Sequence, residues 1–352
     1  MKILSINPGS TSTKIAVYED KREVFSKTLR HSAEELGKYS GIIAQFDFRR
    51  QMITDALEEN NIDAREIKAI VGRGGLLRPI PSGTYEVNDL MKEDLSLCRY
   101  GEHASNLGGL LADAIAKEIP GCRAFIADPV VVDELQEVAR ISGHPLFKRL
   151  SIFHALNQKA IAKRYAEETG RPYESLNLIV VHLGGGTSVG AHRKGLIVDV
   201  NNCLNGEGPF SPERSGSLPA QQLAELCFSG KYTLEQVKKM INGKGGCVAH
   251  LGTNNFIDIE NNLDKPEYKL ICDAYLYNVA KEVGAKAAVL KGEVDAILIT
   301  GGIAYGKGMM ADLTDYIKFI APVKLYPGED EMGALAGNGL AVLTGKEQSK
   351  VY

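Results

Sequence analysis

Apolar residues follow two different spacings along the chain. Short, nearly continuous apolar runs predict buried strands at residues 2–6, 14–18, 69–71, 124–126, 178–183, 190–193, 196–200 and 295–300. Between them, apolar residues recur every three or four positions, which predicts helices at residues 46–60, 102–118, 153–169, 220–228, 234–241, 268–290 and 330–344. Alternating strands and helices predict an α/β fold with mainly parallel sheets.

The two halves of the chain begin alike. Each has an apolar strand, a turn rich in Gly, Ser and Thr, and then a second strand, with the turns half a chain length apart at residues 7–14 and 182–188. This duplication predicts two similar domains that face each other across a cleft, and the length of 352 residues also favours two domains. We expect the first domain at residues 1–150 plus about 333–352, and the second at residues 151–332.

Composition narrows the class of protein. The chain is 44% apolar and 24% charged with a net charge of −3, as in ordinary globular proteins, and this balance argues against a nucleic-acid partner. No apolar run approaches the roughly 20 residues that span a bilayer, and the N-terminus lacks the features of a signal peptide. The six cysteines form no CxxC pair or zinc-like cluster. We therefore expect a cytoplasmic protein with reduced thiols and no membrane partner.

The first turn has the composition of a phosphate-binding loop. Its sequence NPGSTSTK offers a glycine, the hydroxyls of Ser10 and Ser12, and the cation of Lys14. Such a turn can hold phosphate oxygens. A β-hairpin with a polar turn would have the same composition, and only the second, similar turn favours the phosphate interpretation.

The second turn is more specific. Its sequence HLGGGTS places three glycines, Gly184, Gly185 and Gly186, directly after a buried strand that ends near His182. Glycines allow a ligand to approach the backbone closely, and His182 could donate a hydrogen bond to developing charge, although a strained bend and a core histidine are the simpler alternatives. Gly301 and Gly302 follow another buried strand and could let a nucleotide lie against the backbone. The motifs of P-loop, dinucleotide-binding, α/β-hydrolase, zinc-protease and protein-kinase families are absent.

Four motifs in order carry a family resemblance. They are NPGSTSTK at residues 7–14, HLGGGTS at 182–188, RSG at 214–216 and TGGI at 300–303. Together they resemble the acetate and butyrate kinase family of the actin and sugar-kinase superfamily, and the first two, with VGRGG at residues 71–75, resemble its butyrate kinases. The resemblance implies two ribonuclease H-like (actin-like ATPase) domains around a central cleft. It also implies reversible phosphoryl transfer from ATP, with Mg²⁺, to butyrate or isobutyrate, and a homodimer or higher homo-oligomer.

The resemblance also assigns roles to residues of this chain. It implies as catalytic residues Asn7, Asp128, His154, His182 and Arg214. It implies as nucleotide-binding residues Ser10, Ser12, Lys14, Gly184, Gly185, Gly186, Gly301 and Gly302. Arg73, Arg78 and His103 are candidates for the carboxylate pocket, and Asn7, Asp128 and Glu331 for the Mg²⁺ site. An ordinary turn would also explain Asp128 before Pro129, and an ordinary helix start would explain Glu331.

Two departures from the acetate kinase pattern argue against an acetate or propionate kinase. Ala69 and Ile70 stand where acetate kinases have His-Arg, whose arginine helps to bind the carboxylate, and residues 255–257 read NFI instead of Asp-Phe-Arg on the adenosine side. An acetate or propionate kinase is one alternative, and a non-kinase ATP switch of the actin or heat-shock-chaperone kind is another. A carboxylate is already a nucleophile, so a kinase for it needs cations, N–H donors and Mg²⁺ rather than a catalytic triad.

Overall fold

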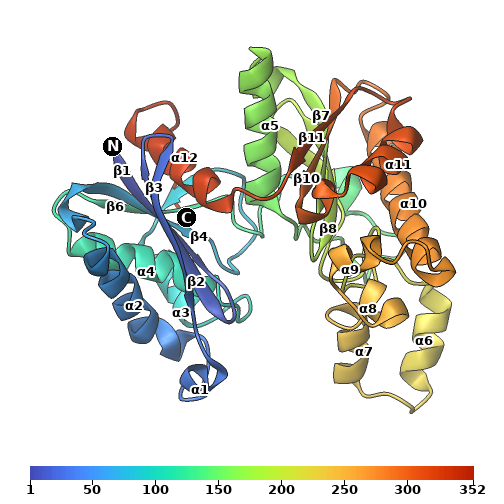
Figure 1. Ribbon diagram of the computed structural model, residues 1–352, viewed down its shortest axis with the longest axis horizontal. Coiled ribbons are helices and arrows are strands. Elements are labelled where there is room, and N and C mark those ends of the chain that lie inside the picture. Colours follow the sequence, from blue (N-terminus) through green and yellow to red (C-terminus); the bar gives the residue numbers. More distant parts are fainter. The chain divides into compact units, whose positions relative to one another are not determined.

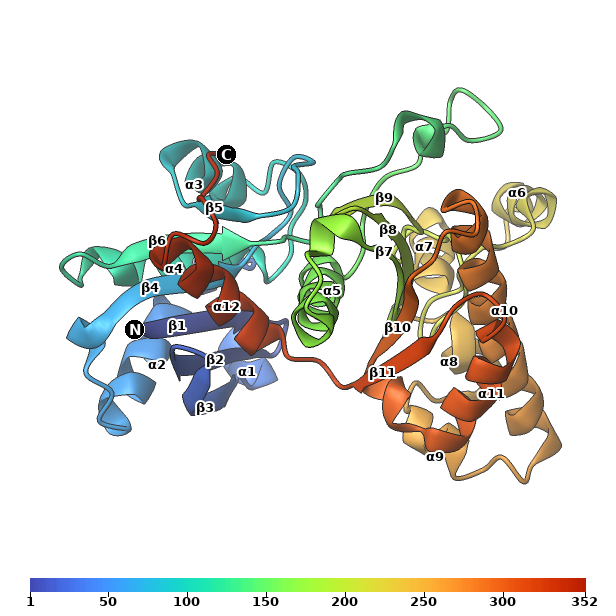
Figure 2. The same ribbon diagram turned by 90° about the horizontal axis from the view of Figure 1, so that it is seen from above.

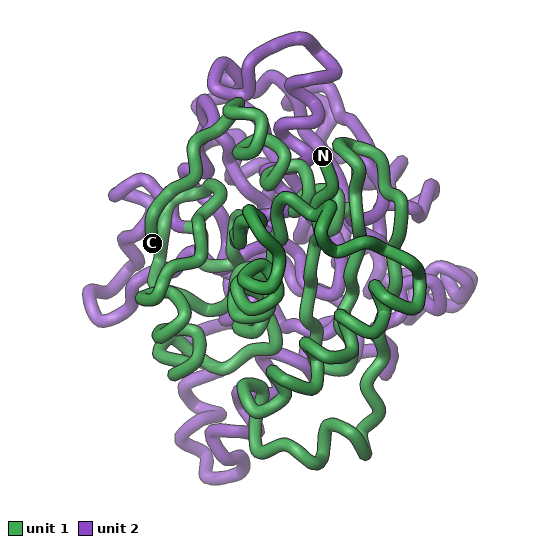
Figure 3. Tube along the Cα trace, turned by 90° about the vertical axis from the view of Figure 1, so that its left-hand side faces the viewer, with its two compact units in different colours: residues 1–132, 330–352 green, residues 133–329 purple.

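The computed structural model describes all 352 residues, which form two compact units (Figure 3). The first unit contains Met1–Val132 and Asp330–Tyr352, and the second contains Asp133–Glu329. The boundaries that we expect for the two domains, near residues 150 and 333, stay predictions. Each unit is built around one sheet.

The sheet of the first unit has six strands in the order β3-β2-β1-β4-β6-β5. The strands are β1 (Lys2–Pro8), β2 (Ser12–Glu19), β3 (Arg22–Arg30), β4 (Ile67–Arg73), β5 (Thr84–Glu86) and β6 (Arg123–Ala127). The three central strands β1, β4 and β6 are parallel, and the outer strands pair antiparallel. The parallel strands end at the same edge, where Asn7, Arg73 and Asp128 lie at or just beyond the strand ends.

Helices cover both faces of this sheet, as Figure 1 shows for α12 on one side and α2 and α4 on the other. The helices are α1 (Ala33–Leu36), α2 (Phe46–Glu59), α3 (Asp89–Ser96), α4 (Asn106–Lys117) and α12 (Glu331–Leu343), with 3₁₀ turns at Ile43–Gln45 and Ala64–Glu66. A β-carbon at Gly72 of β4 would lie 2.1 Å from the Gly108 carbonyl of α4, and one at Gly339 of α12 would lie 2.6 Å from Val71. Neighbouring strand residues point to opposite faces, so both helices pack closely on β4.

The second unit has a five-stranded sheet in the order β11-β10-β7-β8-β9. The strands are β7 (Asn177–Leu183), β8 (Thr187–Arg193), β9 (Leu196–Val200), β10 (Ala296–Gly301) and β11 (Val323–Pro327). Strand β10 is parallel to β7 and β11, whereas β7, β8 and β9 are antiparallel. Leu178 and Val180 pack toward Ala162 of α5, and Ile179 and Val181 face the core of α10 and α11. Fully buried strands explain the continuous apolar runs in the sequence.

The helices of the second unit surround this sheet and extend beyond it (Figure 2). They are α5 (Ala155–Thr169), α6 (Ala220–Phe228), α7 (Leu234–Ile241), α8 (Gly246–Leu251), α9 (Phe256–Glu260), α10 (Pro266–Val289) and α11 (Lys307–Ile317), with 3₁₀ turns at Glu137–Arg140, Tyr173–Ser175 and Gly302–Tyr305. No helix anywhere in the chain combines the length and the apolar character needed to cross a membrane.

The expected α/β class is confirmed, and the differences have local causes. Strand β3 was not predicted because most of its side chains are exposed and polar at the sheet edge. The helix expected at residues 102–118 begins only at Asn106, because residues 103–105 form a turn in which the backbone N–H of Ser105 donates to the His103 ring.

Candidate active site

Arg49 of α2 holds the first glycine-serine turn from inside the protein. Its guanidinium is fully buried and donates to the carbonyls of Gly9 at 2.8 Å, Ser12 at 3.1 Å and Ser10 at 3.2 Å. Its remaining partners are the Thr13 hydroxyl and the Gln45 amide oxygen, so every partner of Arg49 is neutral. Burial lowers the pKa of Arg49 to about 10, which leaves the group charged at neutral pH. A buried cation beneath this turn favours the binding of an anion above it.

The predicted phosphate-binding residues of this turn are accessible. Ser10 is exposed at the tip of the turn, Ser12 begins β2, and Lys14 is an exposed residue of β2 that pairs with Asn7 across the ladder. The Gly9 N–H donates to the Ser12 carbonyl at 2.7 Å and closes the turn, so this N–H is already used.

Asn7, Arg73 and Glu331 meet where β1 and β4 end and α12 begins. The Asn7 Nδ2 donates to Glu331 Oε2 at 2.5 Å, and Arg73 Nη1 lies 3.3 Å from the Glu331 carboxylate and 3.4 Å from Asn7 Oδ1. Arg73, a candidate for the carboxylate pocket, is thus paired with an acid of its own unit. No group of three or more His, Cys, Asp and Glu side chains in the chain could hold a metal by itself. The oxygens of Asn7 and Glu331 fit Mg²⁺ that keeps phosphate and water ligands.

Asp128 is buried directly after β6 in a strained conformation. Its φ is +38°, a region that non-glycine residues rarely adopt. Its Oδ1 accepts hydrogen bonds from Ser82 Oγ at 2.7 Å and from the Gly83 N–H at 2.8 Å. Strain held in place by such contacts is common at functional sites, which is consistent with a role beyond an ordinary turn.

The other two pocket candidates do not join this cluster. The guanidinium of Arg78 stacks on the ring of Tyr352, the last residue, with its carbon 4.4 Å from the ring centroid. His103 lies at the surface, and its Nδ1 accepts from the Ser105 N–H. The surrounding protein and the Arg73 charge lower the pKa of His103.

In the second unit, His154 and His182 stack ring on ring with their centroids 3.8 Å apart. His182 is buried near the end of β7, and its Nε2 lies 3.1 Å from Glu329 Oε1. His154 precedes the first residue of α5. The two predicted histidines therefore form one unit, although 27 residues separate them in the sequence.

Two of the three glycines of the second turn, Gly184 and Gly186, make room for the predicted catalytic side chains. A β-carbon at Gly186 would lie 1.8 Å from Arg214 Nη1, and one at Gly184 would lie 3.0 Å from His182 Nε2. The Gly184 N–H donates to the Gly186 carbonyl at 3.1 Å, and the Gly185 carbonyl accepts from Ser211 at 2.8 Å. The turn is thus packed from below by the predicted catalytic residues.

Arg214 has a donor available for an anion. Its Nη1 donates to the Cys203 carbonyl at 3.1 Å, whereas its Nε is buried without a hydrogen-bond partner. An unpaired buried donor is costly unless a ligand satisfies it, and phosphate oxygens suit the planar guanidinium. Burial raises the pKa of the neighbouring Cys203 thiol to about 11, so Cys203 stays neutral.

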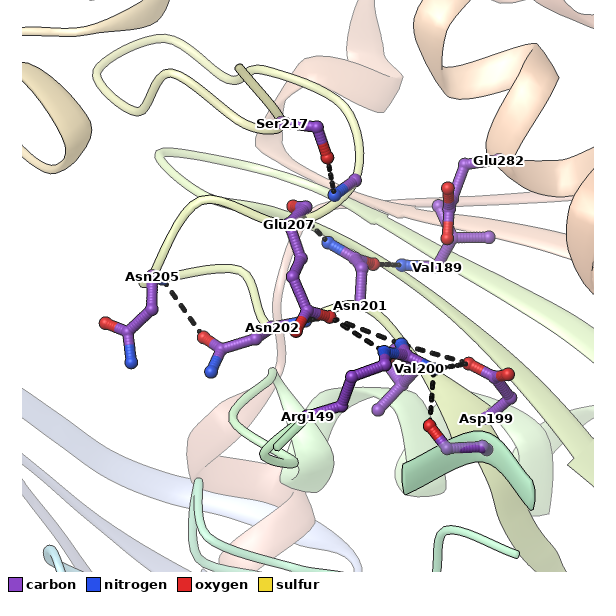
Figure 4. A network of polar contacts seen from close by, with 12 residues as sticks. Arg149, Val189, Asp199, Val200, Asn201, Asn202, Asn205, Glu207, Ser217 and Glu282 are labelled. Atoms are coloured by element: carbon purple, nitrogen blue, oxygen red, sulfur yellow. Dashed lines mark hydrogen bonds and ion pairs between the residues drawn. The ribbon is translucent and has the colours of Figure 1, made fainter. Parts of the chain in front are cut away.

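A partly buried network around Arg149 joins Asp199 to Glu207, as Figure 4 shows, and Glu207 lies in the loop that continues to Arg214. Arg149 lies 3.2 Å from Glu207 Oε2 and 3.3 Å from Asp199 Oδ1, and Lys286 of α10 lies 3.0 Å from the same Asp199 atom. Although burial alone would lower it, the charges of Asp199 and Glu207 raise the pKa of Arg149. Asn201 extends the network by donating to the Thr187 carbonyl at 3.1 Å, beside the glycine turn.

The two glycines after β10 differ. Gly301 has φ +98°, and a β-carbon there would lie 2.1 Å from the Leu183 carbonyl, so its backbone and packing require glycine. Gly302 has open space around it and leaves room for a ligand. In the segment that departs from acetate kinases, Asn255 caps α9, Phe256 packs on Tyr275 and Ile257 is exposed.

Two groups of site residues escape the motif search. Arg49 carries a detectable signal, because it stands on the buried face of α2 with Ile53, Ala56 and Leu57. Ser188 ends the HLGGGTS motif but receives no role from it, and Gln158 carries no signal, since their contact beside His154 depends on how α5 packs against β8.

Comparisons with known proteins place this chain among carboxylate kinases. The model of the Acetokinase family matches residues 146–320. Butyrate kinase 1 of Clostridium acetobutylicum is 58% identical over all of this chain and 99% of its own length, and butyrate kinase 2 of the same organism is 56% identical with the same coverage.

Among solved structures, Porphyromonas gingivalis acetate kinase has a TM-score of 0.76 at 21% identity, covering 97% of this chain and 99% of its own. A Francisella tularensis propionate kinase has a TM-score of 0.70 at 17% identity, covering 96% and 98%. The two structures share this fold.

Proposed function

Because the chain belongs to the acetokinase family and has full-length relatives that are butyrate kinases, we propose that it transfers the γ-phosphoryl group of ATP to butyrate. The products are butyryl phosphate and ADP, and the reaction is reversible. The observation in the structure that carries the proposal is the cluster of His154, His182 and Arg214 around the glycine turn. This cluster supplies hydrogen-bond donors and positive charge.

The chemistry needs positioning more than proton transfer. A butyrate oxygen attacks the γ-phosphorus, the bond to the bridging oxygen of ADP breaks, and no proton has to be removed from the nucleophile. The difficulty is the repulsion between two anions and the charge on the transferred group, which cations and N–H donors relieve.

Three residues of the second unit stabilise the transferred group in this proposal. The unpaired Nε of Arg214 donates to a phosphoryl oxygen, and an arginine in this role is worth about 10³-fold or more in rate. His154 donates to the same group, and His182, stacked on it, donates once its Nε2 exchanges Glu329 for a phosphoryl oxygen. Gly184, Gly185, Gly186 and Gly302 let the nucleotide approach the backbone, whereas Gly301 supports the turn through its packing on Leu183.

Residues of the first unit hold the phosphates and the metal. Ser10, Ser12 and Lys14 bind phosphate oxygens above the buried charge of Arg49. Asn7 and Glu331, together with Asp128, are the oxygen donors that would hold Mg²⁺. When bound, Mg²⁺ neutralises phosphate charge and orients the transferred group.

For the substrate carboxylate, Arg73 is favoured over Arg78. Arg73 lies beside Asn7, whereas Arg78 is engaged with Tyr352. His103 does not join this cluster, and we propose it as a further contact for the carboxylate because its ring is exposed and the Arg73 charge acts on it. We further propose that the protein acts in the cytoplasm as a homodimer or higher oligomer. Its six free cysteines fit a reducing compartment.

The test is acyl-phosphate formation trapped with hydroxylamine, with Mg-ATP and acids from acetate to valerate, including isobutyrate. We expect butyrate or isobutyrate to give product at a kcat/KM well above that for acetate. One methylene in an apolar pocket is worth only about 1–3 kcal/mol, so the preference will be graded. Slow ATP hydrolysis without acyl phosphate would instead support an ATP switch.

A further inference from the structure

A chain of hydrogen bonds runs through the interior of the second unit and ends at His154. Tyr173 Oη lies 2.8 Å from His192 Nδ1, and His192 Nε2 lies 3.0 Å from Gln158 Oε1. Gln158 Nε2 lies 2.9 Å from Ser188 Oγ, which in turn lies 2.9 Å from His154 Nδ1. Gln158, Ser188 and His192 are fully buried, so water does not substitute for any of these bonds.

The direction of these bonds follows from one backbone carbonyl. The Gln158 Nε2 also lies 3.3 Å from the Ser188 carbonyl oxygen, which can only accept. The Gln158 amide therefore points its NH₂ group at Ser188 and its oxygen at His192. Ser188 Oγ contacts only this NH₂ group, which cannot accept, and His154 Nδ1, so the Ser188 hydrogen is directed to His154 Nδ1.

The hydrogen bonds at the other end of this series, between Tyr173, His192 and Gln158, run in the same direction. Since Gln158 Oε1 accepts, His192 carries its proton on Nε2 and accepts from the Tyr173 hydroxyl at Nδ1. Burial, reinforced by the Lys159 charge, lowers the pKa of His192 well below its usual value, so the ring is neutral. Gly190 keeps the path open, because a β-carbon there would lie 2.3 Å from Gln158 Oε1.

We propose that Gln158 and Ser188 are positioning residues that hold His154 as the neutral Nε2–H tautomer, so that Nε2 donates to the transferred phosphoryl group. This inference rests on the proposed function for its catalytic consequence. The His154 ring lies on the side of the glycine turn, since a β-carbon at Gly186 would lie 3.2 Å from its Cε1.

The stacked partner has the complementary arrangement. His182 Nδ1 lies 3.0 Å from Asn157 Oδ1, and its Nε2 lies 3.1 Å from Glu329 Oε1. Both ring nitrogens of His182 therefore have partners of their own, and of the two stacked rings only His154 contacts the Ser188 hydroxyl.

The experiment combines imidazole ¹H–¹⁵N spectra with steady-state kinetics on the full chain. The chain has seven histidines, and a His154→Gln sample identifies the His154 signals. In the wild type we expect His154 to be neutral with its proton on Nε2. In Ser188→Ala we expect His154 to lose this single tautomer and kcat to fall roughly tenfold with little change in either KM. Ser188→Thr keeps the hydroxyl and should restore both.

Thr187→Val is the matched control. It removes the buried hydroxyl of the residue directly before Ser188 in β8. The Thr187 hydroxyl lies 3.0 Å from the Tyr275 hydroxyl and does not contact His154. Its His154 spectrum should match the wild type. Gln158→Met keeps the Ser188 hydroxyl but frees it to turn, so both His154 tautomers should appear even if Ser188→Ala folds poorly.

The spectra are recorded without substrate, so they test the tautomer even if the protein proves inactive on butyrate. A wild-type His154 with its proton on Nδ1, or on both nitrogens, would overturn the proposal. A Ser188→Ala spectrum identical to the wild type, with a loss of kcat no larger than in Thr187→Val, would also overturn it.

Discussion

Arg214 packs against Gly186 so closely that a β-carbon at Gly186 would lie 1.8 Å from the guanidinium Nη1. This contact joins the glycine turn to the arginine that we propose as the main stabiliser of the transferred phosphoryl group. Position 186 therefore requires glycine for the packing of Arg214, whatever ligand the turn binds.

Gly186→Ala should displace Arg214 and lower kcat about 100-fold, because a catalytic group moved by about 1 Å can lose that much. The measurement is steady-state kinetics with Mg-ATP and butyrate, with circular dichroism to confirm folding. Gly284→Ala in α10 is the control, since no atom lies within 4 Å of its new β-carbon. Equal activity in both variants would show that Arg214 need not lie against the turn.

Arg49→Met should weaken ATP binding and destabilise the fold. The variant removes the buried charge and leaves the carbonyls of Gly9 and Ser10 without their Arg49 donor, at about 1–3 kcal/mol for each unpaired group, whereas the Ser12 carbonyl keeps the Gly9 N–H. We expect a raised KM for ATP and a lower urea midpoint. Arg50→Met, which removes an exposed ion pair with Glu118, should change either value little. An unchanged KM for ATP in Arg49→Met would show that the Arg49 charge does not contribute to nucleotide binding.

Arg149→Met should lower kcat while leaving the KM for ATP near the wild-type value. Removal of Arg149 leaves Glu207 without its charged partner (Figure 4). We expect this to loosen the loop that carries Arg214. Arg164→Met is the control, because Arg164 forms an exposed ion pair with Glu168 at 2.8 Å. A large rise in the KM for ATP with unchanged kcat would show that Arg149 does not act by positioning Arg214.

Stability should fall as the pH drops from about 6.5 to about 4. Burial and the Arg49 charge lower the pKa of His31 to about 4, and burial lowers that of His192 as well. Both rings are neutral in the folded protein and gain a proton on unfolding when the pH is below their ordinary pKa. Each histidine therefore lowers the free energy of unfolding by up to about 1.4 kcal/mol for each pH unit of acidification. Urea denaturation at pH 7 and pH 5 measures this slope. His31→Gln should reduce it, and the exposed His144→Gln should not.

The sequence predicts the parts of the site that depend on local motifs. The turns at residues 7–14 and 182–188 and the strand ends at Asn7 and His182 follow from apolar runs and glycine placement. The side chains that contact those residues cannot be predicted from these local patterns. Ser188 meets His154 only because β8 pairs with β7 in one register and α5 packs beside them. The sequence analysis assigns the last segment to the first domain, but the pairing of Arg73 with Glu331 depends on how the last helix packs on the first sheet, which no local pattern indicates.

The most direct measurement is ³¹P NMR of the purified protein with Mg-ATP and butyrate, beside an Arg214→Ala sample. For the wild type we expect ADP and an acyl-phosphate signal to grow together, and for Arg214→Ala we expect a rate lower by about 10³-fold. ATP converted only to ADP and orthophosphate, or no turnover with butyrate or isobutyrate, would contradict the assignment as a carboxylate kinase.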